Sequence, residues 1–170
     1  MAALSAAAVA NEFLDLAKAE GLPIDPMKLQ KLVFYAHAWW LAHKGEALFE
    51  DDIEAWPWGP VVRNLYTQFL EFGRHPIVGK RAKEIMKGGS SSVLAFRFVD
   101  PRIDDVKLKS FLKSIWETHK NYSGVQLSNA THADGEPWTI VKEKYGSLDS
   151  KPRIPNEVIR DVFKAKLNAA

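Results

Sequence analysis

The stretch DPMKLQKLVFYAHAWWLAHKG, residues 25–45, decides the fold of this 170-residue chain. Asp25 has a side chain that can cap a helix, and Pro26 follows at a first-turn position, where proline is tolerated. Gly45 is a typical residue for the end of a helix. Between these signals, apolar residues at helical spacing cover almost the whole helix surface, which predicts a central, buried helix.

Working outward, helical spacing recurs in six other stretches. Ser5 and Asp105 or its neighbour Asp104 are suitable N-caps, and Pro60 is read as the start of a third helix. The sequence predicts helices over residues 5–20, 25–45, 60–72, 104–120, 123–131, 136–146 and 155–167. The chain shows neither a solenoid repeat nor a domain boundary. We therefore predict a mainly α fold, with about six or seven helices in a single domain over residues 1–170.

Two short segments alternate like strands rather than helices. Residues 53–58 alternate around Pro57, and residues 93–99 alternate as a second candidate. Because an isolated strand needs a partner, we expect these two segments to pair as a small two-stranded β insertion. The second candidate closes a polar, glycine- and serine-rich excursion, residues 73–99, which we interpret as a variable insertion.

The composition argues against several classes of function. The formal net charge is +2 and no long basic run occurs, so binding to nucleic acid is not supported. The absence of cysteine excludes disulfides and thiolate catalysis, and agrees with a reducing compartment. Neither a signal-peptide pattern nor an apolar run of roughly 20 residues is present. We therefore expect a cytoplasmic protein without a membrane contact.

An enzymatic interpretation depends on one cluster. His132, Asp134 and Glu136 place three potential metal ligands within five residues, which leaves a metal-dependent hydrolase as an alternative. Their spacing matches no ligand signature, however, and they lie where a helix begins, where such residues often cap or pack. Glycine-rich phosphate loops and a nucleophile elbow are also missing. We predict no enzyme activity, no metal and no cofactor.

Tryptophan is the most suggestive residue type, with six copies in the chain. Trp40 and Trp116 lie on apolar helix faces and are expected in the core. Trp56 and Trp58 flank a proline in a segment without helical spacing, so both rings are hard to bury together. Exposed Trp beside Arg63 is typical of a protein-binding hot spot. A partner-binding surface and a buried core are both open interpretations of this pair.

Three blocks of sequence carry a family resemblance. The first is MKLQKLVFYA, residues 27–36, continuing to Trp39, and the second is EAWPWGPVV, residues 54–62, followed by Tyr66 and Phe69. The third comprises residues 127–138, with a weaker echo over residues 154–163. In this order the blocks resemble the SocA-like, or Panacea-domain, family of antitoxins, which are often encoded in prophages.

The resemblance implies an antitoxin that neutralises a cognate protein toxin by direct binding. It also implies that some members act as proteolytic adaptors, which present the toxin to a protease such as ClpXP. It does not identify the toxin, and the 73–99 insertion carries no family motif. A DNA-binding autoregulator is the remaining alternative, although a helix-turn-helix with a basic recognition helix is not recognisable.

The matched positions suggest which residues bind the toxin. They comprise one side of the second helix, the Trp-Pro-Trp corner and the third block: Lys28, Lys31, Tyr35, Trp39, Trp56, Trp58, Arg63, Thr131, His132 and Trp138. We hypothesise that the three pieces converge on one groove. The alternative is that they form the shared core of the family, which is favoured for Gly59, Pro60, Thr131 and Trp138.

Overall fold

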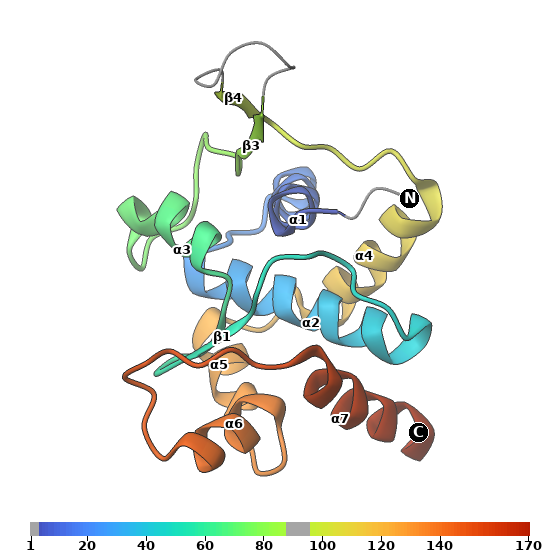
Figure 1. Cartoon of the computed structure of the whole chain (residues 1–170). Helices are drawn as coiled ribbons and strands as arrows, with labels where there is room; N and C mark the ends of the chain where they lie inside the picture. Colours follow the sequence, from blue (N-terminus) through green and yellow to red (C-terminus); the bar gives the residue numbers. More distant parts are fainter. Residues whose placement is uncertain (1–3, 88–95) are drawn as a thin grey trace.

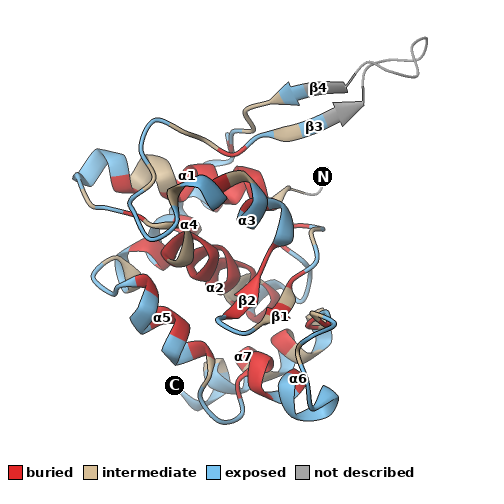
Figure 2. Cartoon of the chain, turned by 90° about the vertical axis from the view of Figure 1, so that its left-hand side faces the viewer, coloured by how far each residue is buried: buried red, intermediate tan, exposed pale blue. Residues whose placement is uncertain are grey.

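Helix α2 (Pro26–Lys44) runs through the middle of the molecule in the computed structural model, which describes residues 4–87 and 96–170 (Figure 1). The carboxylate of Asp25 accepts a hydrogen bond from the backbone N–H of Lys28 over 2.8 Å, and Gly45 ends the helix in the left-handed conformation. Most of α2 is buried around its circumference (Figure 2). The predicted central helix is therefore confirmed.

The other helices surround α2. They are α1 (Ala6–Glu20), α3 (Arg63–Phe69), α4 (Val106–His119), α5 (Gly124–Thr131), α6 (Pro137–Tyr145) and α7 (Asn156–Ala169), with a short 3-10 helix η1 (Leu70–Phe72) after α3. Helices α7, α5 and α1 make the most extensive contacts with α2. The core that they enclose is rich in aromatic rings, including Phe34, Trp116 and Phe163. Trp40, predicted to be buried, is instead partly exposed and packs edge-on against Phe111.

A two-stranded hairpin follows α2 and turns at Pro57 and Trp58. Its strands β1 (Glu54–Trp56) and β2 (Gly59–Val61) are antiparallel, and Ala55 lies opposite Pro60. The segment after α6 runs beside β1, because the N–H of Ala55 donates to the carbonyl of Pro152 over 2.7 Å. This hairpin, called the corner hairpin below, is therefore tied to the segment that connects α6 to α7.

The structure corrects two predictions about this region. The predicted pairing of residues 53–58 with residues 93–99 is wrong, because each segment pairs with its own neighbour along the chain. Pro60 does not open a helix: it lies in β2, and α3 begins at Arg63. The side-chain amide of Gln30 explains the difference. It donates to the carbonyl of Val62 and accepts from the N–H of Val62, and so holds residue 62 extended.

The second hairpin, β3 (Glu84–Lys87) with β4 (Phe96–Val99), projects from the body as an arm (Figures 1 and 2). Its base is held by Asn11 of α1, which is fully buried. The amide of Asn11 donates to the carbonyl of Ala82 over 2.9 Å and accepts from the N–H of Ala82 over 2.7 Å. Residues 96–99 of the predicted 93–99 strand are thus extended, whereas residues 93–95 lie outside the described residues.

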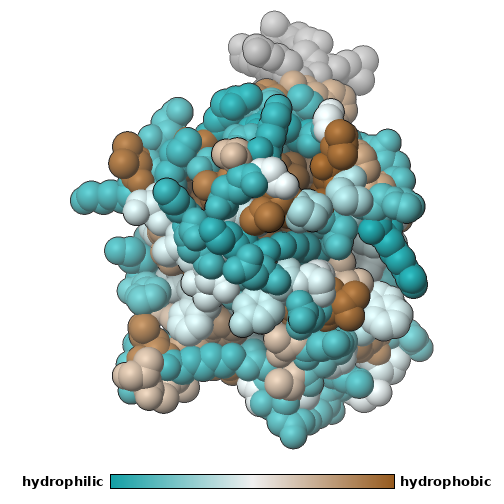
Figure 3. Space-filling view, turned by 180° about the vertical axis from the view of Figure 1, so that it is seen from behind, coloured by the Kyte–Doolittle hydropathy of each residue, from teal (hydrophilic) through white to brown (hydrophobic). Residues whose placement is uncertain are grey.

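The prediction of a mainly α fold is confirmed, although the described residues contain two small antiparallel sheets instead of one. In the part of the chain that the structure describes, every helix is too short or too polar to cross a membrane. Seen from behind, the surface is mostly hydrophilic, with small and separate hydrophobic patches (Figure 3).

Candidate partner-binding surface

The corner hairpin is fixed to the rest of the molecule through its backbone oxygens. The hydroxyl of Ser128 donates to the carbonyl of Trp58 over 2.6 Å. The indole N–H of Trp138 donates to the carbonyl of Trp56 over 2.7 Å. Each anchoring side chain is buried, so these bonds are shielded from water. Side chains of α5 and α6 thus fix the positions of Trp56 and Trp58 through hydrogen bonds to the backbone of the hairpin.

Gly59 allows the close approach that this anchoring requires. Its φ of +108° is unfavourable for residues with a side chain. A Cβ atom on residue 59 would lie 2.7 Å from Oγ1 of Thr131 and 2.9 Å from Cε of Lys31. The predicted residues Lys31 and Thr131 therefore pack on the inner side of the hairpin, where only glycine fits.

The contact region between the corner hairpin and helices α2, α5 and α6 is called the buried junction below. Lys31 is unusual there because it is a lysine that is only 1% exposed. Its ammonium group donates to the carbonyl of Pro60 over 3.2 Å. Salt bridges to Lys31 are absent from the described residues. Burial lowers the pKa of Lys31 to about 8, against a weaker opposing effect of Asp25. Burying this ammonium group without a carboxylate partner costs stability, and its one described hydrogen bond is to the corner hairpin.

Lys28, one turn earlier on α2, faces a different part of the molecule. Its ammonium donates to the backbone carbonyl of Lys120 and lies 5.5 Å from the ring centroid of Trp116. Burial lowers the pKa of Lys28 as well. Lys28 therefore connects α2 to the end of α4 and does not reach the corner hairpin.

His132 and Trp138 form a stacked pair behind the corner hairpin, with ring centroids 3.9 Å apart. His132 is the C-terminal capping residue of α5, and its Nε2 atom is buried without a hydrogen-bond partner among the described residues. Its pKa is lowered by burial and by the positive charges of Lys31 and Lys142. The rings pack as a structural unit that holds Trp138 against Trp56.

The hydrolase alternative receives no support from this arrangement. Glu136 is engaged by an ion pair with Lys166. Among residues 4–87 and 96–170, no group of three His, Asp or Glu side chains is placed so that it could hold a metal ion. His132, Asp134 and Glu136 therefore lie near one another in sequence without forming a ligand set.

On its outer side the corner hairpin presents aromatic and cationic groups. The side chain of Trp58 is 69% exposed. Trp56 is half-buried and packs against Tyr66 at 4.7 Å between ring centroids. The guanidinium of Arg63 lies 5.4 Å from the Trp56 ring centroid, and the ammonium of Lys151 lies 4.3 Å from it. We call this cluster, Trp56, Trp58, Arg63, Tyr66 and Lys151, the aromatic corner.

Tyr35 and Trp39 line a separate groove of about 880 Å³ between α2, α4, α5 and α7. Tyr35 stacks on His119 at 4.7 Å, and Trp39 meets the edge of Phe163 at 5.0 Å. Burial, together with the charge of Glu136, raises the pKa of Tyr35 to about 12, so its hydroxyl stays protonated. Aromatic rings thus form part of the groove wall, together with polar residues of α4 and α5 and with Lys166 of α7.

The predicted residues accordingly fall into four places. Lys31, Thr131, His132 and Trp138 meet at the buried junction, Trp56, Trp58 and Arg63 lie at the aromatic corner, Tyr35 and Trp39 line the groove, and Lys28 joins α2 to α4. Sequence reasoning missed Gln30, Ser128 and Lys151. Gln30 and Ser128 lie in the first and third family blocks, which were the available signal for them, whereas Lys151 lies outside all the blocks.

Comparison with known proteins agrees with the resemblance carried by the three sequence blocks. The model of the family "Antitoxin SocA-like, Panacea domain" matches residues 29–139, which include the corner hairpin, α5 and the start of α6. The chain is 33% identical over 162 residues to "Antitoxin SocA" of Caulobacter vibrioides, covering 95% of this chain and 83% of that relative. No solved structure matches the chain. The chain belongs to the family of SocA-like antitoxins with a Panacea domain.

Proposed function

We propose that this antitoxin neutralises a cognate protein toxin by direct binding in the cytoplasm, and that the toxin contacts the aromatic corner. The observation that carries the proposal is Trp58, a large ring that is 69% exposed on a hairpin fixed by Ser128 and Trp138. Exposed Trp next to Arg is the composition of binding hot spots. A fixed hairpin loses little conformational entropy on binding, which favours affinity.

The remaining predicted residues have supporting roles in this proposal. Lys31, Thr131, His132 and Trp138 position the corner hairpin from within, and Lys28 supports the helix from which Lys31 projects. Tyr35 and Trp39 offer the toxin a second, concave contact on the far side of α5. The protein acts as a binding partner and not as an enzyme, and the chemistry of the junction is structural.

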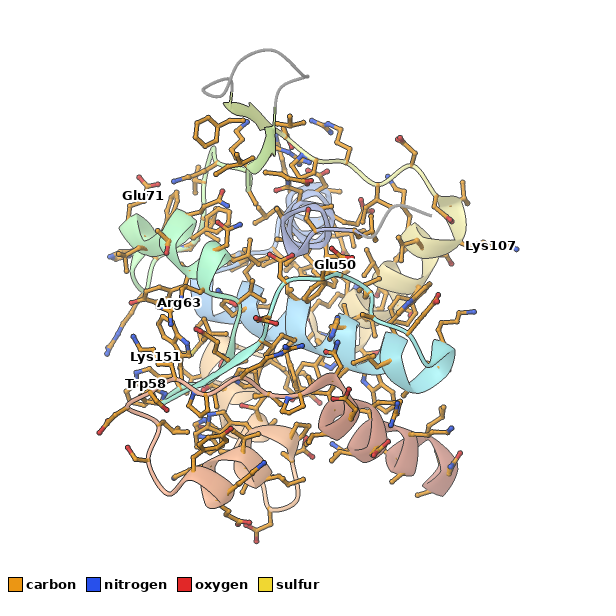
Figure 4. All side chains as sticks on the ribbon, viewed as in Figure 1. Glu50, Trp58, Arg63, Glu71, Lys107 and Lys151 are labelled. Carbon is orange, nitrogen blue, oxygen red and sulfur yellow. The ribbon has the colours of Figure 1, made fainter. Side chains whose placement is uncertain are left out.

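We further propose that binding delivers the toxin to ClpXP. An adaptor must hold its cargo while leaving other surface free for the protease. Trp58, Arg63 and Lys151 of the aromatic corner lie on the opposite side of the molecule from Lys107 of α4, so we expect a toxin bound at the corner to leave α4 free (Figure 4). Family membership supports the antitoxin role, and protease delivery is the finer step that needs its own test.

Growth rescue tests the proposal. The protein encoded by the adjacent open reading frame is expressed from an inducible promoter, with and without the antitoxin, in strains with and without ClpXP. We expect toxicity that the wild type relieves and that Trp58→Ala relieves poorly. The matched control is Val78→Ala, an exposed residue between η1 and β3.

Toxin half-life separates the two parts of the proposal. Rescue with rapid toxin loss only in the ClpXP-containing strain supports delivery to the protease. Rescue with unchanged toxin half-life supports binding alone and contradicts delivery. A toxin that the wild type cannot neutralise contradicts the whole proposal.

A further inference from the structure

The charge balance of the aromatic corner indicates what kind of surface it binds. Glu54 is the carboxylate that contacts Trp56, and both of its oxygens accept hydrogen bonds from residues of the corner. It accepts from the indole N–H of Trp56 over 3.2 Å and pairs with Arg63 at 2.8 Å. Asp52 and Arg153, both exposed, form a second ion pair, with 3.0 Å between Oδ1 of Asp52 and Nε of Arg153. Both of these carboxylates are therefore paired with an arginine.

Lys151 is the cation of the aromatic corner that forms no salt bridge with a described residue. Its ammonium lies over the Trp56 ring and has no salt bridge among the described residues. Lys142, over the ring of Trp138 at 5.1 Å, also lacks a described carboxylate partner. Since Trp138 is bonded to the carbonyl of Trp56, both free cations adjoin the same cluster. Within the aromatic corner itself, the two cations Arg63 and Lys151 face the single carboxylate of Glu54.

The backbone of Lys151 adopts an unfavourable conformation where its side chain lies over Trp56. Its φ of +49° makes it the one described residue other than glycine with a left-handed backbone. Such conformations are unfavourable for residues with a Cβ and are often found at functional sites. The turn is closed by a hydrogen bond from the N–H of Lys151 to the carbonyl of Leu148 over 2.9 Å. Residues 152–154 then run beside β1, which fixes the lysine over Trp56.

Trp58, Lys151 and Arg63 lie one above another on the same flank of the molecule (Figure 4). An exposed ring next to a fixed cation without a salt bridge is complementary to an apolar pocket rimmed by carboxylates. We propose that the aromatic corner binds an acidic surface of the toxin, with Trp58 inserted into an apolar depression and Lys151 facing carboxylates at its rim. This inference rests on the proposed function and adds the chemistry of the partner.

The test separates the two residues by kinetics. Association and dissociation of the purified antitoxin and toxin are measured for the wild type, Lys151→Glu, Lys151→Arg and Trp58→Ala, at several salt concentrations. Lys44→Glu is the matched control, because Lys44 also lies over a tryptophan ring, 5.7 Å from the centroid of Trp40, at the other end of α2. The melting temperature of each variant shows that it is folded.

We expect Lys151→Glu to slow association about 10-fold or more at low salt, because like charges then oppose the encounter. Lys151→Arg should retain fast association, and salt should slow the wild type more than Lys151→Glu. Trp58→Ala should act mainly on dissociation and weaken binding by about 30-fold or more, as loss of a hot-spot ring does. Lys44→Glu should behave as the wild type.

Three outcomes overturn the inference. Association of Lys151→Glu at the wild-type rate would show that the toxin surface is not acidic at this point. Binding of a DNA duplex from the antitoxin's own promoter, lost in Lys151→Glu, would assign the corner to nucleic acid. Failure of the wild type to bind the toxin would overturn the proposed function itself, whereas intact wild-type binding with unaffected variants would overturn only this inference.

Discussion

Gly59 and Thr131 fit together only while residue 59 has no side chain, because a Cβ atom there would lie 2.7 Å from Oγ1 of Thr131. The same backbone has a φ of +108°. The close approach brings the corner hairpin against α5, where Ser128 holds the carbonyl of Trp58. A single glycine thus determines how tightly the aromatic corner is held.

Replacing Gly59 should therefore be costly. We expect Gly59→Ala to lower the free energy of unfolding by about 2–4 kcal/mol, from backbone strain and steric overlap together. Urea unfolding measures the loss. Gly45→Ala is the control, since Gly45 is also left-handed but has nothing within 4 Å of an added Cβ, and it should cost about 1 kcal/mol. Equal losses for the two variants would show that the contact with Thr131 is unimportant.

The buried Lys31 should make stability depend on pH above neutrality. Its pKa falls from 10.5 in the unfolded chain to about 8 in the fold. Between these values the unfolded state binds more protons, so stability of the wild type rises with pH through this window. The full shift corresponds to about 3 kcal/mol, which is the cost of burying the charge below pH 8.

Lys31→Met removes this dependence. Urea unfolding from pH 7 to pH 10.5 should show the wild type gaining stability relative to Lys31→Met by up to about 3 kcal/mol as the pH rises. Lys164→Met, at an exposed position on α7, should follow the wild type in parallel. A constant difference between wild type and Lys31→Met would mean that Lys31 titrates normally.

His132 should report the charge of its neighbours. Its pKa is lowered by burial and by the charges of Lys31 and Lys142, so it should titrate below 6.5 in an NMR pH series. Lys142→Ala should raise that pKa, because a repelling charge is removed. Lys144→Ala, two residues further along α6, is the control and should leave it unchanged. A pKa that does not rise in Lys142→Ala would show that Lys142 is too well screened to act on His132.

Asn11 should control the base of the β3–β4 arm. Asn11→Ala leaves the N–H and carbonyl of Ala82 without their buried partners. We expect a loss of about 2–4 kcal/mol in the free energy of unfolding and faster hydrogen exchange at residue 82 and in β3. Asn64→Ala, at an exposed position on α3, should cost less than about 1 kcal/mol. Unchanged exchange in the arm would show that Arg81 and its ion pairs hold it instead.

Helix ends were the most predictable part of the fold, since their signals are local. Asp25 caps α2, Ser5 caps α1, and Asp105, one of two candidates, caps α4, as their positions indicate. The helix predicted to start at Pro60 was wrong, because a proline that suits a first helical turn suits equally well a short strand that has no neighbour on one side. The deciding contact came from Gln30, thirty residues away in sequence, which no local pattern reveals.

The candidate site was predicted only in part. The family blocks identified the residues that meet at the junction, but spacing alone could not tell which of them face solvent. Lys31 is buried and Trp58 is exposed, the reverse of what charge and hydropathy suggest. Lys151 was missed because its place over Trp56 depends on a left-handed turn and on the pairing of residues 152–154 with the corner hairpin.

The anchors of the corner hairpin have an evolutionary consequence. Ser128, Trp138 and Lys31 donate to the main-chain carbonyls of Trp58, Trp56 and Pro60, respectively, and every amino acid provides such a carbonyl. The side chains at positions 56 and 58 can therefore be exchanged while the hairpin keeps its pose. A lineage that encounters a new toxin can change what the corner recognises by substituting its outward side chains, without rebuilding the scaffold that presents them.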